Sequence, residues 1–309
     1  MIELSGVGKT FGAMRALHDI TFAVPTGSVC ALLGHNGAGK TTTVNILSTL
    51  LRPSTGHALV GGHDVVRDAD KVRAAISVTG QDASVDLLLT GRENLILFSR
   101  LRGLSRRDAR KRADEMIERF DLAKAADRQV MTYSGGMRRR IDIAASLVVT
   151  PQVLFLDEPT TGLDPRSRRD VWSLVSELRD QGVTVLLTTQ YLEEADVLSD
   201  SIIILNGGEI IASGTAEQLK RHLGFAYCQV TPVSPDDLSA VATALADYEG
   251  LEIDTDLNTV SLPAANGVAT LGEVFRRIEG LGVELLDISL RKPSLDEVFL
   301  HLTERPVTA

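Results

Sequence analysis

Residues 34–42 decide the fold of the first part of this chain, and they are Gly34-His35-Asn36-Gly37-Ala38-Gly39-Lys40-Thr41-Thr42. They contain a glycine, four variable residues and then Gly-Lys-Thr. The apolar run 28–33 predicts a short buried strand before them, and residues 41–51 predict a helix after them. In the order strand, glycine-rich loop, helix, this pattern indicates a phosphate-binding loop. The sequence therefore predicts an α/β fold that binds a nucleotide.

The residue types in this loop suit a nucleotide and its metal ion. Glycines let the backbone aim successive N–H groups at phosphate oxygens, and the helix that follows adds the positive end of its dipole. Lys40 is expected to reach the β- and γ-phosphates, and the Thr41 hydroxyl is expected to bind Mg²⁺. We therefore assign all nine residues to nucleotide binding.

A second Gly-Lys-Thr occurs near the N-terminus, in the run Ser5–Thr10. Glu3 occupies the position where the pattern requires its first glycine. Phe11 and Gly12 follow the threonine, and no amphipathic helix begins there. We therefore reject this run as a phosphate-binding loop.

Two acidic residues follow another apolar run. Residues 153–156 are Val-Leu-Phe-Leu, and Asp157 and Glu158 come directly after them. A buried parallel strand of this kind places Asp157 at the carboxyl edge of the sheet, where Mg²⁺ and its water shell are expected. Glu158 is the candidate that polarises the attacking water, which makes it the predicted general base.

A third motif makes the assignment specific. Tyr-Ser-Gly-Gly-Met at 133–137 precedes a helix-forming run and lies a short distance before Asp157. The motif resembles the Leu-Ser-Gly-Gly-Gln signature of ABC-type ATPases, with substitutions at Tyr133 and Met137. The resemblance covers about residues 1–220. It implies a P-loop NTPase cassette with a RecA-like core, an antiparallel β part and a helical subdomain at about 88–150.

The resemblance also assigns further residues to ATP and Mg²⁺. Gln81 resembles the Q-loop glutamine, which is expected at both the nucleotide and the metal ion. Asp164, in Gly-Leu-Asp-Pro at 162–165, resembles the D-loop aspartate. Phe11 occupies the place of the aromatic residue that stacks on adenine. Ser134, Gly135 and Gly136 would contact the γ-phosphate of an ATP molecule held by a second, facing cassette.

One position departs from the family pattern. The family has a switch histidine after the strand expected at 183–188, and this chain has Gln190 there. A glutamine amide can donate a hydrogen bond to the γ-phosphate, but it cannot become a cation. Gln190 together with Tyr-Ser-Gly-Gly-Met-Arg-Arg-Arg resembles the daunorubicin/doxorubicin-resistance type of ABC ATPase subunit.

Charge separates the chain into two parts. Residues 1–222 carry 27 basic and 27 acidic side chains, whereas 223–309 carry 5 and 14, which accounts for the net charge of −9. We therefore predict an ATPase cassette at 1–222 and an accessory or assembly domain at 223–309. The order strand, helix, strand, strand, helix, strand across 226–291 predicts a small ferredoxin-like α+β domain. Ser294 and Glu297 predict a capping box that starts a last helix.

The expected function is that of an ATP-hydrolysing subunit of a multi-component ABC transporter, which exports hydrophobic drugs or antibiotics across the plasma membrane. The 44% hydrophobic and 24% charged residues exclude a disordered or fibrous protein. No apolar run reaches the roughly 18 residues of a membrane-spanning helix. We therefore expect a peripheral protein at the cytoplasmic face, whose partners are a membrane-spanning permease and a second copy of the cassette.

Two alternatives stay open at this point. An importer ATPase shares all the catalytic motifs, so only the resemblance to drug-export subunits favours export. A non-transport ABC protein that acts on ribosomes or DNA is disfavoured, because the chain has a single cassette without a long coiled-coil interruption. The acidic balance also argues against nucleic acid as a partner.

Overall fold

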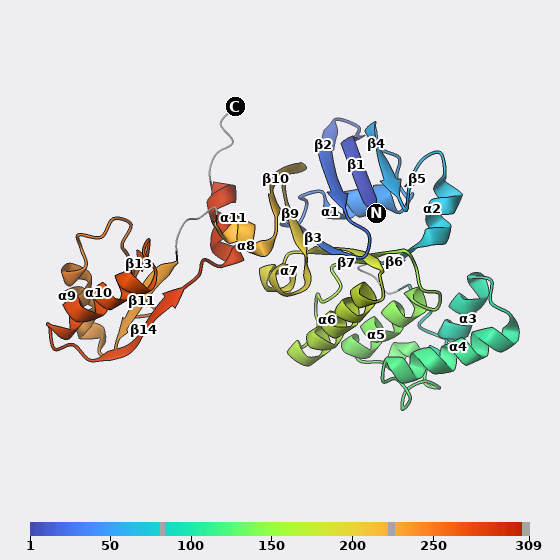
Figure 1. The fold of residues 1–309 in the computed structure, drawn as a ribbon. Coiled ribbons are helices and arrows are strands. Elements are labelled where there is room, and N and C mark those ends of the chain that lie inside the picture. Colours follow the sequence, from blue (N-terminus) through green and yellow to red (C-terminus); the bar gives the residue numbers. More distant parts are fainter. Residues whose placement is uncertain (81–83, 222–225, 305–309) are drawn as a thin grey trace. The chain divides into compact units, whose positions relative to one another are not determined.

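The computed structural model describes residues 1–80, 84–221 and 226–304 (Figure 1). It divides into two units, Met1–Thr215 and Ala216–Ala309. The charge pattern predicts a boundary at 222, whereas the structure divides before helix α8 (Ala216–Arg221). The reason is that α8 packs against the last helix, α11 (Leu295–Glu304), and so belongs to the second unit.

The first unit is centred on a six-stranded sheet in the order β10-β9-β3-β8-β7-β6, in which all pairs except β10–β9 are parallel. Its central strands consist of buried residues only, which explains why β3 and the first four residues of β7 are continuous apolar runs rather than alternating ones. The strands are β3 (Val29–Leu33), β6 (Ile76–Thr79), β7 (Val153–Asp157), β8 (Thr184–Thr189), β9 (Ser201–Asn206) and β10 (Glu209–Gly214).

An antiparallel sheet in the order β2-β1-β4-β5 forms the second layer of this unit. Its strands are β1 (Ile2–Phe11), β2 (Met14–Val24), β4 (Thr55–Val60) and β5 (His63–Asp64). The second Gly-Lys-Thr of the chain lies inside β1, which confirms that it is not a phosphate-binding loop. Helix α1 (Lys40–Leu47) contacts strands of both sheets, and one apolar core joins the two layers through residues such as Ile2, Ile46 and Phe155.

Three helices form a separate layer next to β6 (Figure 1). They are α3 (Gly91–Leu101), α4 (Arg106–Arg119) and α5 (Gly135–Ser146), and they occupy the span predicted for the helical subdomain. Thr90 and Glu93 form a capping box at the start of α3. The remaining helices of this unit are α2 (Ala69–Ala75), α6 (Pro165–Asp180), α7 (Leu192–Leu198) and a short 3₁₀ turn at Val130–Thr132.

The second unit has a four-stranded antiparallel sheet in the order β12-β13-β11-β14. After α8, the chain follows the predicted order of a ferredoxin-like domain. Its elements are β11 (Tyr227–Pro232), a 3₁₀ turn (Pro235–Asp237), α9 (Leu238–Ala244), β12 (Glu252–Asp254), β13 (Thr259–Pro263), α10 (Val268–Glu279) and β14 (Leu285–Arg291). Alternate strand residues such as Val230 and Val260 form the core with α9 and α10.

Helix α11 begins with the predicted capping box. The Ser294 N–H donates to Glu297 Oε2 at 2.8 Å, and the Glu297 N–H donates to Ser294 Oγ at 3.2 Å. Leu295 and Val298 are buried, whereas Leu300 on the same helix is 54% exposed. In the part of the chain that the structure describes, no helix is both long and apolar enough to cross a membrane.

Candidate nucleotide-binding site

The phosphate-binding loop borders a hollow of about 450 Å³ in the first unit. The residues around it come from β1, β2, the loop, α1 and the end of β7. They are Phe11, Met14, Ala16, Asn36, Gly37, Gly39, Lys40, Thr41, Thr42 and Glu158. The fold therefore brings the predicted loop, the predicted aromatic residue and the predicted general base to one place.

The loop adopts a backbone that only glycine tolerates at two positions. Gly37 and Gly39 have φ values of 84° and 106°. A Cβ atom at Gly39 would lie 2.6 Å from Leu17 Cδ2, so a larger residue would also clash with β2. Gly39 then caps α1, whose free N–H groups begin at the loop. The loop thus has the form expected for binding phosphate.

Lys40 lies folded over its own loop. Its Nζ donates to the carbonyl oxygens of Gly34 at 2.7 Å and His35 at 3.1 Å, and it lies 3.5 Å from Glu158 Oε1. The side chains of Lys40 and Glu158 are only 4% and 9% exposed. An ammonium group with little water around it binds phosphate oxygens strongly, because charge-assisted hydrogen bonds gain strength where water is scarce.

Asp157 and Thr41 place oxygen atoms side by side at the edge of the sheet. The Thr41 hydroxyl donates to Asp157 Oδ2 at 3.1 Å, and the Thr188 hydroxyl donates to Asp157 Oδ1. The described residues contain no cluster of three or more His, Cys, Asp or Glu side chains that could enclose a metal ion. One hydroxyl and one carboxylate suit Mg²⁺, which binds few protein ligands and takes the others from phosphates and water.

Glu158 has an unusual backbone conformation, with φ of 47°. Left-handed φ is uncommon for residues other than glycine, and it occurs where the surroundings hold it in place. The Glu158 N–H donates to both the carbonyl and the hydroxyl oxygen of Thr188, at 3.2 Å and 3.0 Å. The Thr161 hydroxyl donates to Glu158 Oε2 at 3.3 Å. Strand β8 therefore fixes the turn that aims this carboxylate at the hollow.

Gln190 follows β8 directly and is half-buried. Strand β8 lies between β3, which leads into the phosphate-binding loop, and β7, which ends at Asp157. Thr188 pairs with Asp157 and Thr189 pairs with Leu33, so Gln190 follows β8 at the same edge of the sheet. Among the described residues, no hydrogen bond is made by the Gln190 side-chain amide. The amide is therefore available to a ligand at this edge.

The signature residues start α5 away from the hollow. Ser134 caps the helix by accepting a hydrogen bond from the Met137 N–H at 3.3 Å. Gly135 faces open space, whereas a Cβ atom at Gly136 would lie 2.5 Å from Ser167 Oγ. In the described chain, Ser134, Gly135 and Gly136 do not border the 450 Å³ hollow of their own unit.

Asp164 caps α6. Its Oδ1 accepts from the N–H groups of Arg166 and Ser167, each at 3.0 Å, and its Oδ2 accepts from the Ser167 hydroxyl at 2.7 Å. These hydrogen bonds, those from Ser167 above all, lower the pKa of the Asp164 carboxyl. Asp164 does not border the hollow among the described residues, and Gln81 lies outside the described residues.

Sequence reasoning missed several residues at this site. Met14 and Ala16 border the hollow from β2, and no motif marks them. Arg139 is the second of three consecutive arginines, a run typical of a solvated helical face, yet its side chain is only 10% exposed. Asp142, three residues further along α5, is buried with it. An arginine and an aspartate three residues apart on one helix can form an ion pair, and this spacing is the sequence feature that could have indicated the contact.

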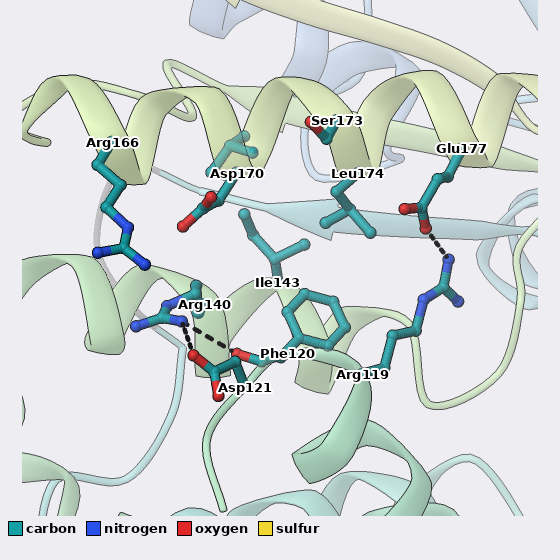
Figure 2. Close-up of a pocket in the computed structure, with 11 residues that line it drawn as sticks. Arg119, Phe120, Asp121, Arg140, Ile143, Arg166, Asp170, Ser173, Leu174 and Glu177 are labelled. Atoms are coloured by element: carbon teal, nitrogen blue, oxygen red, sulfur yellow. Dashed lines mark hydrogen bonds and ion pairs between the residues drawn. The ribbon is translucent and has the colours of Figure 1, made fainter.

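Figure 2 shows a second hollow of the first unit, about 260 Å³, where the end of α4 meets α5 and α6. Arg119 lies 3.2 Å from Glu177, and Arg140 lies 3.7 Å from Asp121. Phe120 adds apolar surface between these two ion pairs. None of the residues predicted to bind the nucleotide borders this hollow, so the phosphate loop remains the candidate centre for hydrolysis.

Comparison with known proteins agrees with this geometry. Residues 17–161 match the family model of the ABC transporter domain. The chain is 52% identical to the doxorubicin resistance ATP-binding protein of Mycobacterium tuberculosis, over 99% of this chain and 94% of the relative. It is 49% identical to the daunorubicin/doxorubicin resistance ATP-binding protein of Streptomyces peucetius, over 99% and 93%.

A solved structure shows the same fold. It is the dimeric, post-hydrolysis state of an ATP-binding cassette bound to ADP and Pi, which matches with a TM-score of 0.64 and 27% identity over 70% of this chain and 98% of that chain. The chain therefore belongs to the ABC transporter family, as an ATP-hydrolysing subunit that resembles the daunorubicin and doxorubicin resistance ATP-binding proteins.

Proposed function

We propose that this chain hydrolyses ATP at the hollow beside residues 34–42 and uses Glu158 as the general base. The observation that carries the proposal is the position of the Glu158 carboxylate, which β8 holds at the border of the hollow and within 3.5 Å of Lys40 Nζ. Lys40 would bind the phosphates in exchange for its loop carbonyls. Glu158 would then accept a proton from the attacking water.

The residues present fit Mg²⁺ as the accompanying ion. Thr41 and Asp157 would hold it, because their oxygen atoms already lie within hydrogen-bond distance of each other. A bound Mg²⁺ would neutralise charge on the phosphates. Thr188 keeps the Asp157 carboxylate in place through its hydroxyl. Gln190 would donate its amide N–H to the γ-phosphate and hold it in line with the water.

The assembly proposed here contains two copies of the chain and a permease at the cytoplasmic face of the plasma membrane. Ser134, Gly135 and Gly136 lie away from the hollow of their own unit, which supports their action on the ATP of a facing copy. The names of the relatives support drug export as the transport reaction, because they describe ATP-binding proteins of doxorubicin and daunorubicin resistance.

The test is a Glu158→Gln variant of the purified chain. The amide keeps the size of the side chain and removes the base, so we expect turnover to fall by on the order of 10²–10⁴ while ATP binding persists. Glu193→Gln, at an exposed acid of the same unit, is the matched control and should hydrolyse normally. Equal turnover by wild type and Glu158→Gln would disprove the assignment.

A further inference from the structure

We propose that a buried ion pair on α5, between Arg139 and Asp142, positions Glu158 for hydrolysis and couples it to the signature helix. This inference rests on the proposed function, since it names the residues that hold the general base. Arg139 does not border the hollow in the described chain, so it acts as a positioning residue.

Arg139 binds the carbonyl oxygens of the two residues on either side of Glu158. Its Nε donates to the Pro159 carbonyl at 2.8 Å, and its Nη2 donates to the Asp157 carbonyl at 3.3 Å. A planar guanidinium with five donors can contact several carbonyls in one fixed arrangement. Because Glu158 lies in the left-handed region, its turn needs such external contacts to persist.

The same ion pair holds the two residues that flank segment 81–83. Arg139 Nη1 donates to the Gly80 carbonyl at 2.7 Å, and Asp142 Oδ1 accepts from the Ser84 N–H at 2.7 Å. Arg139 Nη1 and Asp142 Oδ2 are 3.4 Å apart. One pair of side chains therefore connects α5, the loop after β7 and the chain after β6.

Burying the charges of Arg139 and Asp142 costs desolvation free energy. The Asp142 side chain is 2% exposed, and burial raises the pKa of its carboxyl. Burial also lowers the pKa of the Arg139 guanidinium, against the attraction of Asp142 and Asp157. Buried ion pairs often contribute little net stability compared with apolar residues of similar volume. The hydrogen bonds to carbonyls beside Glu158 indicate positioning as the purpose.

The coupling follows from where α5 begins. Its first residues are the signature glycines, and Arg139 lies one turn further along the same helix. A change at the start of α5, such as contact with the nucleotide of a facing copy, would move Arg139 and thereby the turn at Glu158. The pair would then make hydrolysis depend on the second copy.

The test compares variants of the full chain by kcat and KM for ATP. Arg139→Gln removes the charge and most of the carbonyl contacts, so we expect kcat to fall by on the order of 10–100-fold with KM changed by less than about threefold. Arg139→Lys keeps a charged donor beside Asp142 and should recover part of this loss. Asp142→Asn keeps an acceptor for the Ser84 N–H and should lower kcat to a smaller extent.

Arg140→Gln is the matched control. Arg140 is the next residue of α5, but it contacts the Phe120 carbonyl and Asp121 beside the hollow of Figure 2. Its kcat and KM should equal those of wild type. Thermal unfolding of each variant shows which ones retain the fold, and Asp142→Asn decides the question if Arg139→Gln does not fold.

Three results would overturn the inference. The first is a wild-type kcat in Arg139→Gln, or in Asp142→Asn if Arg139→Gln does not fold. The second is a loss of kcat in Arg140→Gln equal to that in Arg139→Gln, and the third is a loss of kcat in Arg139→Gln accompanied by a large rise in KM. Failure of the proposed function looks different, because wild type and Glu158→Gln would then hydrolyse ATP at the same rate.

Discussion

The two units of this protein both pack helices on a β-sheet, yet among the described residues the predicted nucleotide-binding groups gather in the first unit. In the first unit, β3, β7 and β8 run parallel, so the loop, Asp157 and Gln190 all lie at the carboxyl ends of strands, along one edge of the sheet. In the second unit, neighbouring strands run antiparallel, so their ends alternate between two edges.

The size of a hollow does not distinguish the two units. The second unit has a hollow of about 770 Å³, larger than the 450 Å³ at the phosphate loop. Glu252, Asp254 and Glu297 border the larger one together with Arg291, which pairs with Glu297 at 3.5 Å, so Glu252 and Asp254 leave an excess of negative charge that would repel phosphate groups. The comparison shows that strand direction and convergent charge, rather than volume, make the first unit the ATPase.

The largest effect in this comparison is expected from removing the positive charge of Lys40 in the first unit. Lys40→Met removes the ammonium that is expected to bind phosphate and leaves Glu158 without its 3.5 Å counter-charge. We expect kcat/KM for ATP to fall by on the order of 10³. Lys292→Met, in the second unit, serves as the control in the same steady-state assay. If the two variants behave alike, the first unit is not the catalytic one.

A truncation examines what the second unit contributes. Removal of residues 294–309 deletes α11 and the buried side chains of Leu295 and Val298. Loss of this packing should destabilise the second unit, so we expect pairing of the chain to weaken by about tenfold in sizing experiments with ATP, while turnover per assembled pair stays within about threefold. A chain that ends at residue 304 is the control. Unaltered pairing after loss of α11 would contradict an assembly role.

Gln190→His restores the residue that the family pattern has at this position. An imidazolium can add positive charge beside the γ-phosphate, which an amide cannot do. We therefore expect kcat to rise by about 3–10-fold, with the rise greatest below about pH 7. A pH profile of kcat for both forms is the measurement. A lower kcat in the histidine form would show that the edge of the first sheet is adapted to glutamine.

The smallest effect concerns a buried acid on α7. Glu194 is 0% exposed, burial raises the pKa of its carboxyl, and Trp172 Nε1 donates to it at 3.2 Å. Because the pKa of Glu194 is higher in the folded protein than in the unfolded chain, its protonation favours the folded state at low pH. This contribution to the free energy of unfolding is complete below the unfolded-state pKa and is lost as the pH rises through the folded-state pKa.

Glu194→Gln removes this loss, because the amide has no charge to desolvate. We expect the melting temperature of the variant to exceed that of wild type by a few degrees at about pH 8, with the difference shrinking towards about pH 5. Glu193→Gln, at an exposed neighbour, should show no such trend. A difference that grows as the pH falls would reverse the sign of the argument.

Much of this molecule is predictable from local pattern. The loop at 34–42, the apolar strand before Asp157 and the capping box at Ser294 each depend on neighbouring residues, and the structure has them where the sequence predicts them. The order of elements in the second unit follows from alternation and helix periodicity in the same way.

The contacts between distant segments were not predictable. Arg139 belongs to a run of three arginines, and only the packing of α5 against β6 and the end of β7 buries it while Arg140 stays beside an open hollow. Met14 borders the nucleotide hollow because β2 pairs with β1, a relation that no motif encodes. These features depend on tertiary placement, which residue types and spacings do not specify.

The central claim is that the carboxylate of Glu158 performs the chemistry that the first unit gathers around the phosphate loop. Its most direct test is a single-turnover measurement, in which ATP and Mg²⁺ are bound to excess protein and phosphate release is followed. We predict that Glu158→Gln binds ATP but slows phosphate release by on the order of 10²–10⁴, whereas Glu252→Gln in the second unit releases it at the wild-type rate. Wild-type release by Glu158→Gln would contradict the account.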